Sequence, residues 1–159
     1  MAHLAKTTKT RRRILLADDS PAVLTGICRL LEGKFEIVGT VQDGLALLSA
    51  VKKLHPDVVI TDIMMPGLSG LDAVRRLNKM PQVKAKSILL TVLNDPYLAD
   101  EARAAGVMGY VTKVSADRDL VDAINTVLAG EFYLSPILRT PTSAKQFIDP
   151  LPGSPVRRR

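Results

Sequence analysis

Residues 58–70 have the sequence VVITDIMMPGLSG, and this stretch decides the fold. Val58, Val59 and Ile60 are apolar on successive positions, which is typical of a strand buried on both faces. An aspartate, Asp62, follows almost at once, and a glycine-containing loop then leads into a helix predicted over residues 71–79. A doubly buried strand followed by a helix indicates a parallel sheet covered by helices on both sides.

The same alternation of strand and helix extends outward in both directions. Upstream, the patterns predict strands at 14–17 and 35–41 and helices at 21–31 and 45–54. Downstream, they predict strands at 87–91 and 109–112, a weak Ala-rich helix at 99–105 and a helix at 117–129. Because crossovers between parallel strands are right-handed, five such units predict an α/β fold, a doubly wound five-stranded parallel sheet of the type (βα)5.

The composition fits one intracellular domain. The chain has 159 residues, of which 47% are apolar, so a sizeable core is available and wholesale disorder is excluded. Cys28 is the single cysteine, which excludes an internal disulfide and a cysteine-based zinc cluster and fits a reducing compartment. No apolar run approaches the roughly 20 residues of a membrane helix, so we expect a cytoplasmic protein without membrane contact.

The net charge of +6 belongs to the two ends of the chain. Residues 14–138 hold 12 basic and 15 acidic residues, so the body is mildly acidic. The basic ends could gather around phosphates by counterion release, although short Lys/Arg ends are more often simply solvated. We expect a basic disordered tail at 1–11, a domain at 12–135, and a Pro-rich basic linker or tail at 136–159.

Polar side chains follow four of the predicted strands where each strand ends. In an open parallel sheet these carboxyl ends meet at one edge, where ligands bind. Each residue alone has an ordinary explanation, such as capping the next helix, but chance rarely places all of them in the useful loops. The residues are Asp18, Asp19, Asp62, Thr91 and Lys113.

This set of groups suits phosphoryl transfer. Carboxylates brought close together repel one another, and a hard divalent ion such as Mg²⁺ relieves that repulsion. A metal ion and Lys113 would neutralise charge on phosphoryl oxygens, and the Thr91 hydroxyl would donate to another oxygen. Asp62 can then attack phosphorus as a nucleophile.

On these motifs the chain resembles the receiver domain of two-component response regulators, over residues 12–135. The resemblance implies a flavodoxin-like fold, with Asp62 as the phospho-acceptor for a sensor histidine kinase or phosphotransfer protein. It also implies that Thr91 and Lys113 engage the phosphoryl group and that Tyr110 rotates on activation. It further implies an Mg²⁺ site made of Asp18, Asp19, Asp62 and the backbone carbonyl of Met64.

Residues 109–113 and 129–136 look most like the subfamily whose receiver precedes a LuxR-type helix-turn-helix domain. This similarity implies regulation of transcription, a phosphorylation-dependent homodimer, and DNA contact only through an output domain. Residues 136–159 contain no helix-turn-helix pattern, so we expect either a receiver cut from a longer protein or a natural single-domain regulator. Val92 and Val114 depart from the pattern, in which a smaller residue and a proline are usual.

Two other functional classes remain as alternatives. A pseudo-receiver would keep the fold as a protein-interaction module without needing phosphate, but it has no reason to retain all five polar residues. A phosphatase or ATPase with an aspartate nucleophile would need a second acid beside Asp62, where the neighbours are Thr61, Ile63 and Met64. We therefore expect a signalling switch and not an enzyme.

Overall fold

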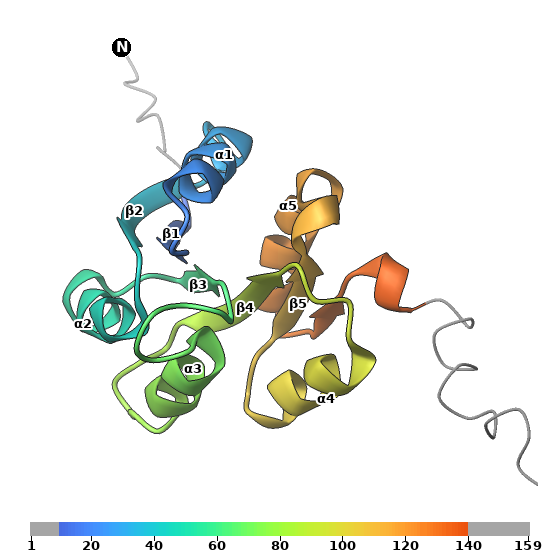
Figure 1. Ribbon diagram of the computed structural model, residues 1–159. Helices are drawn as coiled ribbons and strands as arrows, with labels where there is room; N and C mark the ends of the chain where they lie inside the picture. Colours follow the sequence, from blue (N-terminus) through green and yellow to red (C-terminus); the bar gives the residue numbers. More distant parts are fainter. Residues whose placement is uncertain (1–9, 140–159) are drawn as a thin grey trace, which may run out of the picture.

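The computed structural model describes residues 10–139 and contains a parallel sheet in the order β2-β1-β3-β4-β5-β6 (Figure 1). This architecture confirms the predicted doubly wound, flavodoxin-like α/β fold. The predicted number of five strands is corrected to six. The strands are β1 Arg13–Ala17, β2 Glu36–Val41, β3 Val58–Thr61, β4 Lys86–Thr91, β5 Gly109–Thr112 and β6 Tyr133–Leu134.

Five α-helices cover the two faces of this sheet. Figure 1 shows α1 and α5 on one face and α2, α3 and α4 on the other. Four of the helices begin at a side chain that accepts a hydrogen bond from the first turn, namely Ser20, Asp43, Ser69 and Asp95, which explains where they start. The helices are α1 Pro21–Leu31, α2 Gly44–Leu54, α3 Gly70–Asn78, α4 Pro96–Ala104 and α5 Ala116–Leu128.

The pleat of the central strands divides the core into layers. Ile14 and Leu16 of β1 pack with α1 and α5, while the alternate residues Leu15 and Ala17 pack with α2 and α3. All four are buried, as expected for a strand covered on both faces. The strand order reverses at β1, which lies between β2 and β3. In open parallel sheets, ligands bind at the carboxyl ends of the strands at such a point.

The sixth strand extends the domain toward its C-terminus. Tyr133 and Leu134 pair in parallel with Gly109 and Tyr110 of β5. A strand of two residues is too short for hydrophobic periodicity to reveal, which is why the sequence did not predict it.

The chain after β6 also packs on the domain. Residues 136–138, assigned to the tail by their proline content, form the 3-10 turn η2, and Leu138 is buried in a cluster with α3 and α4. The remainder of the two predicted tails, 1–9 and 140–159, lies outside the described residues. Within residues 10–139, no helix has the length and apolar character required to cross a membrane.

Candidate functional site

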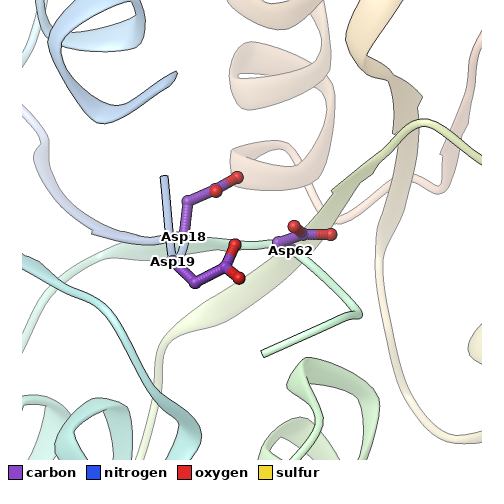
Figure 2. Close-up of side chains that lie close together, drawn as sticks. All are labelled: Asp18, Asp19 and Asp62. Atoms are coloured by element: carbon purple, nitrogen blue, oxygen red, sulfur yellow. The ribbon is translucent and has the colours of Figure 1, made fainter. Parts of the chain in front are cut away.

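Three carboxylates meet at the carboxyl ends of β1 and β3 (Figure 2). Asp18 and Asp19 directly follow β1, and Asp62 directly follows β3, its neighbour in the sheet. One carboxylate oxygen from each residue lies within 4.8 Å of the others. Asp18 and Asp62 are buried, whereas Asp19 is exposed, so the cluster is open to solvent on one side.

The ammonium group of Lys113 joins the two buried carboxylates. Its Nζ lies 2.7 Å from Asp18 Oδ2 and 3.0 Å from Asp62 Oδ2. Partial burial lowers the pKa of Lys113, but its interactions with the carboxylates of Asp18 and Asp62 outweigh this effect and the net pKa is raised. Lys113 therefore remains charged and holds together two groups that would otherwise repel each other.

Backbone amides fix the orientation of these carboxylates. The Ser20 N–H donates to Asp18 Oδ1 at 2.9 Å, and the Met64 N–H donates to Asp62 Oδ1 at 3.3 Å. At Gly70 a Cβ atom would overlap the backbone carbonyl of Asp62, so only glycine allows α3 to begin this close to the loop that follows β3. The glycine of the motif thus keeps helix and loop in contact.

Thr91 and Met64 lie near the carboxylates in different ways. Thr91 ends β4 and is fully buried, and its Oγ1 accepts a hydrogen bond from the Leu93 N–H at 3.2 Å. The hydroxyl forms no hydrogen bond with Asp62 among the residues described. Met64, in the loop that follows β3, is 67% exposed. The sequence therefore placed both residues at the correct edge, and their roles stay predictions.

Tyr110 is fully buried on β5, and its hydroxyl donates to the Leu93 carbonyl oxygen at 2.8 Å. Burial, with a smaller contribution from the charge of Asp95, raises the pKa of Tyr110 to about 12. Leu93 is thus held from two sides, by the hydroxyl of Thr91 through its N–H and by that of Tyr110 through its carbonyl. The loop between β4 and α4 thus connects Thr91, the predicted phosphoryl ligand, with Tyr110, the predicted switch residue.

The charge of the site suits a divalent cation together with an anion. Ionised, the three carboxylates outweigh the single ammonium of Lys113 by two negative charges, and all the acidic ligand atoms are hard oxygens. A cation there would complete the neutralisation. An anionic group approaching Asp62 would then meet the divalent cation, the ammonium of Lys113 and the carboxyl end of β4. This arrangement suits transfer of a phosphoryl group to Asp62.

Sequence reasoning missed a second polar cluster, made of Thr112, Ser115, Asp119 and Ser135. One signal was present: Asp119 lies four residues before the buried Ala123, on the apolar stripe of the predicted last helix. A carboxylate at such a position needs buried hydrogen-bond donors, but sequence alone does not reveal which residues supply them.

Comparisons with known proteins agree with this geometry. Residues 14–125 match the family model described as the response regulator receiver domain. Response regulator GacA from Pseudomonas viridiflava is 35% identical over 146 residues, which cover 90% of this chain and 67% of GacA. The chain thus spans about two thirds of the length of this curated relative.

Solved structures of similar proteins show the same fold. A LuxR-family two-component response regulator from Aurantimonas sp. SI85-9A1 aligns with a TM-score of 0.79 and 31% identity, covering 87% of this chain and 99% of that one. The isolated receiver domain of RcsB from Salmonella enterica serovar Typhimurium, with the phosphomimetic BeF3-, gives 0.74 and 28% over 81% and 96%. A structure of two RcsB dimers bound to two parallel DNAs also gives a TM-score of 0.74 at 28% identity, over 81% and 66%.

Proposed function

Because this chain belongs to the response regulator receiver domain family, we propose that Asp62 accepts a phosphoryl group from a sensor histidine kinase or phosphotransfer protein. The observation that carries the proposal is the ammonium of Lys113, bound at once to Asp18 and Asp62. This contact holds a cation beside the acceptor oxygen, where negative charge arrives with the phosphoryl group.

The transfer is a substitution at phosphorus. A carboxylate oxygen of Asp62 forms the new P–O bond while the P–N bond of the donor phosphohistidine breaks. The bonding electron pair leaves with the imidazole nitrogen, which takes up a proton. Lys113 stabilises the phosphoryl oxygens, and the Thr91 hydroxyl turns from Leu93 to donate to one of them.

The acidic cluster fits a Mg²⁺ ion. Asp18, Asp19, Asp62 and the backbone carbonyl of Met64 would hold it, since the carboxylate oxygens gather within 4.8 Å and two of these residues are buried. When bound, Mg²⁺ neutralises charge on the transferring phosphoryl oxygens. Asp18 and Asp62 would contact both cations, because the Oδ2 atom of each already contacts Lys113.

The output of the switch follows from the relatives. We propose that a cytoplasmic receiver changes its surface on phosphorylation, forms a homodimer, and regulates transcription through a DNA-binding output domain. The LuxR-family neighbours and the DNA-bound RcsB dimers support this proposal. The alternative is a single-domain or pseudo-receiver that acts as a protein-interaction module without a DNA-binding output.

The test is incubation with acetyl phosphate and Mg²⁺, followed by intact mass and peptide mapping. We expect one phosphate per chain, lost with a chelator or in Asp62→Ala, and retained in the control Asp100→Ala on the exposed side of α4. Phosphate mapped to Ser20 or Ser69, or none at all in the presence of Mg²⁺, would contradict the proposal. The second result would favour the pseudo-receiver.

A further inference from the structure

A buried hydroxyl–carboxylate cluster lies behind the phosphoryl site. Asp119, on the first turn of α5, accepts hydrogen bonds at Oδ2 from Ser115 Oγ at 2.6 Å and from Ser135 Oγ at 2.9 Å. Thr112 Oγ1 and Ser115 Oγ are 2.7 Å apart, and the Thr112 N–H donates to Ser135 Oγ at 3.1 Å. All four residues are buried. The cluster joins β5, the start of α5, and the chain after β6.

A single oxygen of Asp119 receives the hydrogen bonds of the cluster. Ser115 and Ser135 both give their protons to Asp119, so Thr112 donates to Ser115 and completes a chain of hydroxyls that ends on the carboxylate. Within residues 10–139, Asp119 forms no salt bridge. Its side-chain partners are instead hydroxyl donors, and it lies in the first turn of α5, where the helix dipole favours an acidic residue.

Two members of the cluster flank Lys113 in the sequence. Thr112 directly precedes the lysine, and Ser115 ends the 3-10 turn Lys113–Ser115 that follows β5. Ser115 Oγ also lies 3.3 Å from the Thr112 carbonyl oxygen, so the Ser115 side chain folds back over the start of the turn. Neither the turn nor α5 has a side-chain cap at its start. The hydrogen bonds to Asp119 therefore act together with the pairing of Thr112 to β4 and with the bond from the Ala116 N–H to the Lys113 carbonyl oxygen to fix the backbone on both sides of Lys113.

We propose that Asp119 is a positioning residue for Lys113. By binding Ser115 directly and Thr112 through Ser115, it fixes the turn from which the lysine reaches Asp18 and Asp62. Ser135 brings the segment after β6 into the same unit. This inference rests on the proposed function of Lys113 in phosphoryl transfer. It adds that a residue of α5, Asp119, keeps the lysine in position.

The test measures the rate of phosphorylation by acetyl phosphate at saturating Mg²⁺ in Asp119→Ala, Asp119→Asn and Ser115→Ala. We expect Asp119→Ala to react about tenfold more slowly, as for the loss of other groups that orient a reacting side chain. Asp119→Asn keeps an acceptor oxygen, so it falls between Asp119→Ala and the wild type. The matched control is Asp122→Asn, one turn along α5 and exposed, which keeps the wild-type rate.

A double-mutant cycle separates positioning from a general loss of structure. If Asp119 acts through Lys113, adding Asp119→Ala to Lys113→Ala leaves the residual rate unchanged, and Mg²⁺ affinity is the same with and without Asp119→Ala. Multiplicative effects of the two substitutions, or a wild-type rate in Asp119→Ala, would overturn the inference. Should Asp119→Ala fail to fold by circular dichroism, Ser115→Ala replaces it in the same cycle. A wild-type chain that takes no phosphate would instead refute the proposed function itself.

Discussion

The ammonium of Lys113 allows two negatively charged side chains to be buried next to each other. Two carboxylates with almost no exposure, Asp18 and Asp62, are stable side by side because one cation contacts both. Removing one partner would leave the other charges buried and uncompensated, which costs more than the contact itself is worth. The third carboxylate of the cluster, that of Asp19, is exposed and so lies on the solvent side of the buried pair.

The lifetime of the phosphorylated state depends on residues next to the acceptor. Hydrolysis requires a water molecule held in line with the P–O bond, and polar side chains can hold it. Met64 and Leu93, two residues beyond Asp62 and Thr91, are apolar and exposed, so we expect a half-life of minutes to hours. Met64→Asn should shorten the half-life in a mass-spectrometric time course, whereas Met64→Leu should not. A wild-type half-life of a few seconds would show that another group positions the water.

Tyr110 makes stability depend on alkaline pH. Its pKa is about 12 in the fold against an ordinary 10, so the protonated hydroxyl stabilises the fold fully below pH 10. That contribution, about 2 to 3 kcal/mol, is lost as the pH rises through 12. The difference in unfolding free energy between wild type and Tyr110→Phe should therefore shrink over this range, measured by urea denaturation. A constant difference would show that the hydroxyl titrates normally. The exposed Tyr97→Phe serves as control.

At the scale of elements, α4 is the helix with the least apolar anchoring. Its buried residues are only Ala99 and Ala102. Two polar contacts from α3 supplement them: Arg75 donates to Glu101 at 2.9 Å, and Asn78 Nδ2 donates to the Ala105 carbonyl oxygen at 3.0 Å. Local stability follows buried apolar contact, so α4 is the helix whose position is easiest to change.

The Arg75 contact can be removed without touching the core. We expect Arg75→Ala to speed amide exchange over α4 by up to about fivefold, because exposed ion pairs contribute little each. Arg76→Ala, on the same helix and exposed, should leave α4 exchange unchanged. Equal exchange in the two variants, measured by mass spectrometry, would mean that Asn78 and the two alanines suffice to hold the helix.

At the scale of the whole molecule, we expect the hydroxyls of Thr91 and Tyr110 to couple the acceptor site to a distant face. Both bind Leu93, so a Thr91 hydroxyl drawn toward a phosphoryl group releases one of the two hydrogen bonds on that loop. The buried Tyr110 of this structure is one of two packings expected for the switch. The affected face lies between α4 and α5.

Beryllofluoride should therefore act well beyond Asp62. With it bound, we expect altered amide exchange in residues 92–112 and stronger self-association by analytical ultracentrifugation. Tyr110→Ala, which removes the ring, should weaken the response in α4 while leaving beryllofluoride binding intact. Exchange that changes only around Asp62 would rule out this switch.

Much of this molecule was predictable from the sequence, because the relevant signals are local. Runs such as Val58–Ile60 determine strands buried on both faces, and the rule that strand ends meet at one edge placed Asp18, Asp62 and Lys113 together. What escaped prediction depends on contacts between distant residues. Ser135 lies 16 residues from Asp119, and Arg75 lies 26 from Glu101, so no periodicity relates the members of either pair.

We expect the short strand β6 to protect the protein against aggregation as well. It pairs with the otherwise open side of β5, whose residues Gly109–Thr112 are buried, and so leaves β2 as the sheet's longer free edge. Unpaired edges of apolar strands recruit further strands from neighbouring chains. A chain shortened to end at Gly130 should therefore form thioflavin-positive aggregates, whereas one ending at Arg139 should remain monodisperse. The two-residue strand β6 would then determine whether the isolated domain stays monodisperse in solution.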